Sequence, residues 1–514
     1  MSYKEIFRLS HRESIFCCLV FLLGLLTISL GLIVSSDSVM YINVGENIYS
    51  GNGFVFGYGD DIVAFKHQPL YPVLIAVGMY LGFTVEQAAG IIPSASLALL
   101  MFPLFFLGKF LSRTLTGYMA CIICLLSAYL LKVATFAWTD MPYLFLSSVV
   151  IMFLAIYWRY NKISPLIFAG LFAALTVLTK YAGIILIVIG AVIIVVNNRH
   201  NFKRLVIQSV AYGLISGLPL ALWLWTNQSL GYTIGTNMRM GGLSTTISLA
   251  INSLIFDIFS IPLRPVLERG MPVIIIVLVV LLTVLAVIFI KKETLLTYLR
   301  INFPIVTYIF IYAGVLALVT SSLWEGVVGG VMDARKVFVL FPFIIILIIS
   351  TSVFIYDRLK QTKMKLNVKR LLITCFIIFT LVQAYHAGAF INSSRSPGFG
   401  GFNSLVWEND PAIFWLRDND RLMDAAIYTD RKAPLLFQLK RSIKELPISD
   451  KMQIEKLFEE LRNKGSGDAY ICVYLRDSHR QDFTSNGDIL DYNSKYNILV
   501  KAVEFPNAII YKTK

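Results

Sequence analysis

Two acidic residues stand out because each lies where a long apolar run ends. Asp37 directly follows the first apolar run, and Asp140 lies in FAWTDMPYLF, where one run ends and the next begins. A carboxylate at the mouth of a membrane cavity could act as a general base on a hydroxyl group or hold a metal ion. Either acid could instead cap a helix, because Pro142 fits the first turn of a helix capped by Thr139 or Asp140. Asp37 could also be a solvated loop residue.

Basic residues at the same ends of the apolar runs favour an anionic ligand. Lys180 interrupts LTVLTKYAGIILIV, and Arg335 opens a run in VMDARKVFVLFPF. Arginine can bind a phosphate through two parallel hydrogen bonds, so a lipid-linked phosphate is one candidate partner. Lipid headgroups or Asp333 are the alternatives. Weaker candidates lie in the long loop 227–270, namely Arg239, Arg264 and Arg269.

Lys132 is a third cation to consider, because it lies deep in an apolar run and must reach the surface or find a partner. Lys132, Phe136 and Asp140 are spaced four residues apart, so they would share one face if the helix continued through them.

Composition shows what kind of elements must position these residues. Of the 514 residues, 57% are hydrophobic and only 15% are charged, whereas soluble domains carry about 25% charged residues. This excludes a soluble enzyme and a disulfide-stapled secreted domain. Eleven apolar runs are long enough to predict transmembrane helices. They are 15–36, 88–110, 117–137, 141–158, 163–179, 181–197, 205–226, 271–290, 301–321, 336–356 and 370–390.

The charges of the connecting loops predict the orientation. Alternate connections hold 19 of the 27 basic residues before position 391 but only four of the 14 acidic ones. The positive-inside rule places these connections in the cytoplasm. The N-terminus is then cytoplasmic, the tail is extracytoplasmic, and the protein is integral to the cytoplasmic (inner) membrane. The net charge of +14 therefore reflects membrane topology, and no nucleic-acid partner is expected.

Two apolar segments need separate treatment. The first run is about 20 residues long, beyond the usual signal peptide core, so we expect an uncleaved first helix. Residues 69–83 are too short to span the membrane and open with two prolines, which predicts an interfacial or re-entrant helix on the outer face.

The tail after residue 390 predicts a small extracytoplasmic α/β domain, so the chain divides into 1–390 and 391–514. The tail carries 18 basic and 17 acidic residues. We expect helices over 403–419, 431–440 and 449–465, and strands over 425–429, 469–475, 496–504 and 508–512. The tail contains no Gly-rich phosphate loop.

Cysteine and histidine spacing gives no support for a zinc site. Cys121 and Cys124 form a CxxC on a predicted membrane helix, where packing of small residues is the simpler interpretation. Cys472 is the tail's one cysteine, so no disulfide framework is expected there. No cofactor is specified by the sequence; a divalent metal is possible but not required.

Taken in order, these motifs resemble the GT-C membrane glycosyltransferases, in particular the bacterial branch related to protein O-mannosyltransferases and lipid A aminoarabinose transferases. The resemblance covers roughly residues 15–390. Its outer-face motifs are Asp37, then Tyr41, Asn47, Gly51, Gly53 and Phe54, then QPLYP (68–72), WTDMPYLF, LTKYAG and DARK (333–336). Two motifs differ from many relatives, since Ser38 follows Asp37 and Gln68 stands in place of a first proline.

The resemblance implies a GT-C-like fold and transfer of a sugar from a polyprenyl-phosphate carrier on the outer face, with inversion at the anomeric carbon. It implies that Asp37 acts as the base or positions the acceptor, and that Asp140 is the second catalytic acid. Lys180, Arg335 and Lys132 would bind the donor phosphate. The remaining residues of the predicted donor or acceptor pocket are Tyr41, His67, Tyr71 and Tyr181.

The predicted enzyme is thus a polyprenyl-phosphate-sugar-dependent glycosyltransferase whose acceptor is a lipid, glycan or protein. A transporter of an anionic or lipid-linked substrate is one alternative, although transporters usually show repeats and sites near midplane. A glycan polymerase or ligase is another, because loop 227–270 carries several arginines.

Overall fold

The computed structural model describes residues 7–59, 62–65, 67–229, 258, 292–322, 334–358, 365–396, 398–419, 425–447, 451–463, 469–474 and 485–514. Its contacts divide the chain into two units. The first contains residues 1–30, 66–71 and 90–393, and the second contains residues 31–65, 72–89 and 394–514. The C-terminal part of the second unit begins close to the predicted boundary after residue 390. The unit also includes most of the first predicted outer loop.

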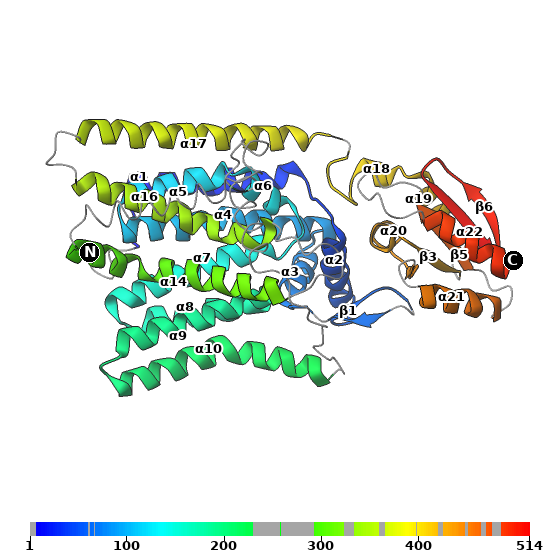
Figure 1. Ribbon diagram of the computed structural model, residues 1–514, viewed down its shortest axis with the longest axis horizontal. Coiled ribbons are helices and arrows are strands. Elements are labelled where there is room, and N and C mark those ends of the chain that lie inside the picture. Colours follow the sequence, from blue (N-terminus) through cyan, green and yellow to red (C-terminus); the bar gives the residue numbers. More distant parts are fainter. Residues whose placement is uncertain are drawn as a thin grey trace. The chain divides into compact units, whose positions relative to one another are not determined.

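The first unit is a bundle of long helices. Figure 1 shows α7, α8, α10 and α14 running alongside one another, and α7 and α10 both pack on α8. The elements are α1 (His11–Leu25), η2 (Leu26–Leu30), α4 (Val85–Leu111, which begins in the second unit), α5 (Thr114–Leu125), α6 (Ala128–Thr135), α7 (Asp140–Tyr160), α8 (Ile163–Thr179), η3 (Tyr181–Gly183), α9 (Ile184–Asn198), α10 (Phe202–Ser229), α14 (Lys292–Ser322), α15 (Ala334–Val337), η5 (Phe338–Leu340), α16 (Phe341–Arg358) and α17 (Lys365–Ser393).

The helices of this unit account for the predicted spans within the described residues. Eight are long and apolar enough to cross a membrane, and the pair α5 and α6, bent by 61°, makes a ninth. Helix α8 matches a tenth predicted span but is only 17 residues long. The eleventh, 271–290, lies outside the described residues. The chain is therefore an integral membrane protein.

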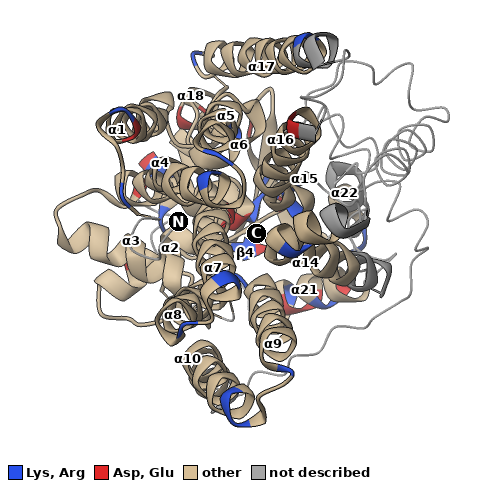
Figure 2. Ribbon diagram, turned by 90° about the vertical axis from the view of Figure 1, so that its left-hand side faces the viewer, with Lys and Arg blue, Asp and Glu red and all other residues tan. Residues whose placement is uncertain are grey.

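Small residues let these helices approach closely, as expected in a bilayer, where no hydrophobic force drives association. A Cβ atom at Gly24 in α1 would lie 2.7 Å from the Ala98 backbone in α4. Cys121 and Cys124 are fully buried, and the Cys121 thiol donates to the Met101 carbonyl oxygen at 3.3 Å. Figure 2 shows that the helix shafts are mostly uncharged and that Lys and Arg gather at helix ends.

The second unit combines part of the first loop with the tail. The loop contributes α2 (Ser36–Tyr49), β1 (Val55–Phe56), β2 (Val63–Ala64) and most of α3 (Leu70–Tyr80). The tail contributes α18 (Leu405–Glu408), α19 (Pro411–Asp418), β3 (Ala426–Thr429), α20 (Lys432–Leu439), β4 (Lys444–Glu445), α21 (Lys451–Asn463), β5 (Ala469–Tyr474), α22 (Ser485–Tyr496), β6 (Leu499–Glu504) and β7 (Ala508–Thr513).

The tail folds around a five-stranded mixed sheet in the order β4-β3-β5-β7-β6. Strands β3, β4 and β5 are parallel, whereas β7 runs antiparallel to both of its neighbours. Strand β5 is buried along its whole length, as a central strand covered on both faces should be. The predicted α/β character of the tail is confirmed.

One predicted tail helix was wrong in its extent. Residues 403–419 form two helices rather than one, because the buried Asp410 side chain accepts from the backbone amides of Ala412 and Ile413 and starts α19 anew at Pro411. The short strand β4 and helix α22 were missed.

Candidate active site

Asp140 begins helix α7 and is completely buried. Helix α6 ends at Thr135, the backbone at Phe136 is extended, and α7 starts at Asp140. The N-cap residue is Thr139, which makes no side-chain capping bond. The Asp140 carboxylate is instead occupied by two cations from distant parts of the chain, so ion pairing rather than capping is its observed role.

The cations are Lys180 and Arg335, and with Asp140 they form what we call the Asp140 cluster. Lys180 Nζ lies 2.7 Å from Asp140 Oδ1. Arg335 donates to Asp140 Oδ2 from Nε at 2.9 Å, and its Nη2 lies 2.8 Å from the same oxygen. The carboxylate side chain is 0% exposed, whereas the Lys180 and Arg335 side chains are 31% and 22% exposed. The three groups together have a formal charge of +1. Because the two cations are partly exposed and the carboxylate is buried, this net positive charge lies at the surface.

Aromatic rings support both cations. The Arg335 guanidinium lies 4.0 Å from the centroid of the Trp138 ring, which stacks on Phe136 at 3.9 Å. Lys180 Nζ lies 5.9 Å from the Tyr143 ring centroid. An aromatic face attracts a cation and fixes its position. No role for Trp138 was predicted from the sequence, although its place two residues before Asp140 was a usable signal.

Breaks in the helices position the side chains of Lys180 and Arg335. Lys180 has extended backbone between α8 and η3, which interrupts the helical run and frees its side chain to turn toward α7. The turn packs tightly, because a Cβ atom at Gly183 would lie 2.7 Å from the Val177 backbone nitrogen. Arg335 comes from the short helix α15. The LTKYAG segment thus forms the compact turn that Lys180 requires.

Beyond Asp140, helices α7 and α14 carry a group of buried hydroxyl groups. Within the described residues, the oxygens of Tyr143, Ser147 and Tyr308 are buried without a hydrogen-bond partner. Tyr312, one turn from Tyr308 on α14, donates to the Lys336 carbonyl oxygen at 2.9 Å. The protein interior next to the Asp140 cluster therefore contains several polar hydroxyl groups, although most of the bundle interior is apolar.

Asp37 belongs to the second unit, where it lies in the first turn of α2 and is partly buried. The cap of this helix is Ser35, whose hydroxyl accepts from the Ser38 amide at 3.4 Å. An acid in the first helical turn interacts favourably with the helix dipole. Its role as the base, implied by the sequence resemblance, remains a prediction.

The other predicted site residues have different surroundings. Tyr41 is buried in α2, with its ring 6.2 Å from that of Phe65, and Tyr71 is buried in α3. His67 is exposed and Tyr181 is partly exposed. Asp333 and the three loop arginines 239, 264 and 269 lie outside the described residues.

The face that Lys132 was expected to share with Phe136 and Asp140 does not form. Helix α6 ends at Thr135, so the spacing of four no longer places these residues on one surface. Lys132 is exposed, whereas Asp140 is buried. The prediction of a shared helical face was wrong because it assumed a continuous helix.

The Asn-Gly motif after Asp37 has a structural function. Asn47 Nδ2 donates to the carbonyl oxygens of Val55 and Gly57, each at 3.2 Å. The Gly57 amide donates to Asn43 Oδ1 at 2.7 Å. These bonds fasten the β1 segment onto α2, and the positive φ values of Gly51 and Gly53 (+83° and +80°) allow the chain to turn back.

The described residues contain no group of three or more His, Cys, Asp or Glu side chains placed to hold a metal ion.

Comparisons with known proteins identify similar sequences and folds. Residues 66–225 match the family described as dolichyl-phosphate-mannose-protein mannosyltransferase. The chain is similar to ArnT from Cupriavidus metallidurans in the apo state, with a TM-score of 0.59, 10% identity and 97% of each chain covered. The same protein bound to undecaprenyl phosphate gives a TM-score of 0.55 at 12% identity, again with 97% of each chain covered.

A third similar structure is the apo oligosaccharyltransferase of Archaeoglobus fulgidus, with a TM-score of 0.54 and 10% identity over 90% of this chain and 69% of that one. The fold is that of a GT-C glycosyltransferase. The GT-C resemblance predicted from the sequence is therefore confirmed. A search of curated proteins finds no sequence that matches this chain.

The family match covers one segment of the chain. Residues 66–225 include Asp140 and Lys180, whereas Arg335 lies beyond them. At about 10% identity the structural similarity concerns the fold.

Proposed function

We propose that this protein transfers a monosaccharide from a polyprenyl-phosphate donor to a hydroxyl group of a lipid, glycan or protein acceptor. The reaction takes place on the outer face of the cytoplasmic membrane and inverts the anomeric carbon. The shared fold supports a glycosyltransferase, and the similar ArnT structure with bound undecaprenyl phosphate supports this class of carrier.

The Asp140 cluster is the observation that carries the proposal. Lys180 and Arg335 are partly exposed cations fixed by a buried carboxylate. A polyprenyl phosphate that leaves the sugar gains negative charge, and preorganised cations stabilise that charge most effectively where water is restricted. Asp140 acts here as a positioning residue, since its buried oxygens are occupied by the two cations.

Asp37 is proposed as the general base. A sugar hydroxyl has a high pKa, so its attack on the anomeric carbon requires a carboxylate within about 3 Å to accept the proton. Direct attack from the side opposite the leaving phosphate explains inversion. Asp37 is partly exposed at the start of α2, as a group that must meet an acceptor should be.

The test uses the full-length protein in lipid nanodiscs with a radiolabelled polyprenyl-phosphate sugar. Asp37→Asn should abolish transfer while donor binding persists, and Arg335→Gln should weaken donor binding and transfer together. The matched control is Arg113→Gln, since Arg113 pairs with Asp357 at the other end of the Ala334–Asp357 span. Full transfer by Asp37→Asn would exclude the base role, and donor binding without any transfer by the wild type would favour a transporter.

A further inference from the structure

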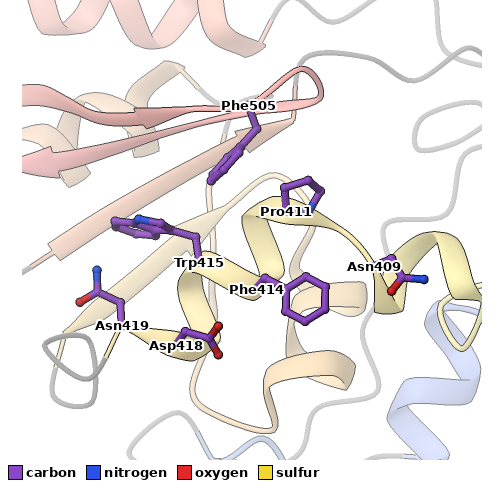
Figure 3. A pocket seen from close by; sticks show the side chains of 7 residues that line it. All are labelled: Asn409, Pro411, Phe414, Trp415, Asp418, Asn419 and Phe505. Atoms are coloured by element: carbon purple, nitrogen blue, oxygen red, sulfur yellow. The ribbon is translucent and has the colours of Figure 1, made fainter.

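A groove in the tail is lined by none of the residues assigned to the candidate active site. It has a volume of about 570 Å³, within the range of small-molecule sites. We call it the α19 groove; its lining residues are Asn409, Pro411, Phe414, Trp415, Asp418, Asn419 and Phe505. Figure 3 shows Phe505 reaching from the turn between β6 and β7 toward Pro411 and Trp415 on α19.

The sequence of α19 brings most of these residues onto one helical face. Pro411, Phe414, Trp415 and Asp418 are spaced at i, i+3, i+4 and i+7, which aligns them along one side of a helix. The opposite face, with Ala412, Ile413 and Leu416, is buried. The helix therefore packs through its aliphatic face and leaves an aromatic face for another partner.

Asp410 fixes the two sides of the groove to each other. Besides capping α19, its carboxylate accepts from Tyr474 of β5 at 3.3 Å and from Asn507 Nδ2 at 2.5 Å. Asn507 follows Phe505 by two residues, so these bonds hold the β6–β7 turn against the start of α19. Burial, with the neighbouring carboxylates, raises the pKa of Tyr474, which keeps this hydroxyl a donor.

The chemistry of the lining favours a neutral saccharide. Phe414 is 41% exposed, with the Arg417 guanidinium over one face of its ring at 5.7 Å, and Trp415 and Phe505 are partly exposed. The remaining aromatic faces are available for the C–H face of a sugar ring. Asn409, Asn419 and Asp418 place amide donors and acceptors and a carboxylate beside them, which suits a rim of hydroxyls. Among the seven lining residues the charged group is Asp418, and its formal charge is balanced by Arg417 beside Phe414, which favours a neutral ligand over an anion.

We infer that the α19 groove binds a neutral saccharide belonging to the acceptor. This deepens the proposed function and rests on it for the identification of the saccharide as an acceptor. Lipid chains would bury the Asn419 amide and the Asp418 carboxylate against hydrocarbon, and burying polar groups without partners is costly.

The test measures binding without donor, so that it does not depend on transfer. Full-length protein in nanodiscs is titrated with N,N′-diacetylchitobiose, α-1,6-mannobiose and lactose, and with glucose 1-phosphate as an anionic probe, by saturation-transfer NMR. At least one neutral disaccharide should bind saturably. Phe414→Ala and Asp418→Asn should each weaken its binding about tenfold, the size of one lost stacking or hydrogen-bonding contact.

Trp415→Phe should retain binding that Trp415→Ala loses, which separates stacking from folding. The control is Leu490→Ala, because Leu490 is an exposed apolar residue (48%) of α22 outside the groove. Absence of binding by all three disaccharides would overturn the inference. So would wild-type binding by Phe414→Ala and Asp418→Asn, or preferential binding of glucose 1-phosphate. Asp37→Asn should bind the saccharide normally, so loss of transfer with intact binding bears only on the proposed mechanism.

Discussion

The molecule contains two charge clusters that are built in opposite ways. In the Asp140 cluster one carboxylate lies between two cations, and the carboxylate is the buried member. In the second unit one cation, Lys440, lies 2.8 Å from Glu46 and 3.7 Å from Glu86. There the cation is 50% exposed, and Glu46 also accepts from Tyr58 at 2.6 Å. Which member is buried determines what the cluster can do.

A buried carboxylate holds cations whose charge remains available at the surface, which suits an anionic ligand. The Lys440 cluster instead pairs its cation with two carboxylates and is open to solvent, so it ties α20 of the tail to α2 of the first loop. Solvent and salt weaken such exposed pairs. The first cluster should therefore control the reaction, and the second should only adjust stability.

Asp140→Asn should have the largest effect. It leaves Lys180 and Arg335 side by side without their shared counterion, and breaking a buried ion pair costs about 3–5 kcal/mol. Transfer should be lost and the thermal unfolding temperature in nanodiscs should fall markedly. The control, Asp357→Asn, removes an acid of the same unit whose partner Arg113 is 51% exposed. It should change transfer and the unfolding temperature little. A stable, active Asp140→Asn protein would contradict the comparison.

Lys180→Met should leave the protein folded but lower kcat by about 10²- to 10³-fold, because one preorganised charge at the developing phosphate is lost. Lys132→Met is the matched control, since Lys132 is exposed and its helix ends before Asp140. Single-turnover transfer measures both. Equal losses in the two variants would mean that general positive charge, rather than the cluster, matters.

Trp138→Leu should have an intermediate effect. It removes the ring beneath Arg335 without touching a charge, and a cation–π contact of this kind contributes about 0.5–2 kcal/mol. We expect a decrease in kcat/KM of up to about 30-fold, with partial rescue by Trp138→Tyr. A decrease in Trp138→Tyr as large as in Trp138→Leu would assign Trp138 to packing alone.

Lys440→Met should have the smallest effect, at most about 1 kcal/mol of unfolding free energy, as for other exposed pairs. Burial alone would lower the pKa of Lys440, but the hydrogen bond and charge of Glu46, with Glu86, raise it above the ordinary 10.5. The stabilisation is therefore fully present below pH 10.5 and is lost as the pH rises through the higher folded-state pKa. Thermal unfolding of the wild type and Lys440→Met should differ at pH 8 and converge as the pH rises through the folded-state pKa of Lys440. If the two proteins still differed in stability at high pH, Lys440 would stabilise the protein through packing rather than through its charge.

The helices could be predicted because their signal is local. Long apolar runs with charged ends predicted every described span, although the 61° bend between α5 and α6 was missed. Ser127 caps α6 within that run, but one small polar residue is a weak signal among so many apolar ones. Asp410-Pro411, in contrast, is a plain helix-start signal that should have divided residues 403–419.

The candidate site could be predicted in its members but not in its geometry. Asp140, Lys180 and Arg335 were each singled out because charge at a membrane boundary is costly. Their mutual contacts join residues 40 and 195 positions apart, which local sequence does not determine. Lys132 was grouped with them by helical spacing, and the spacing lost its meaning where α6 ended.

The interruption between Thr135 and Asp140 has a wider consequence. Non-helical backbone at membrane depth is tolerated only where protein covers it or water reaches it. Ala137 and Thr139 are almost completely buried, so protein covers much of this four-residue break. A bulkier side chain at Ala137 should therefore displace the neighbouring Trp138 ring and, with it, the Arg335 guanidinium that lies over that ring.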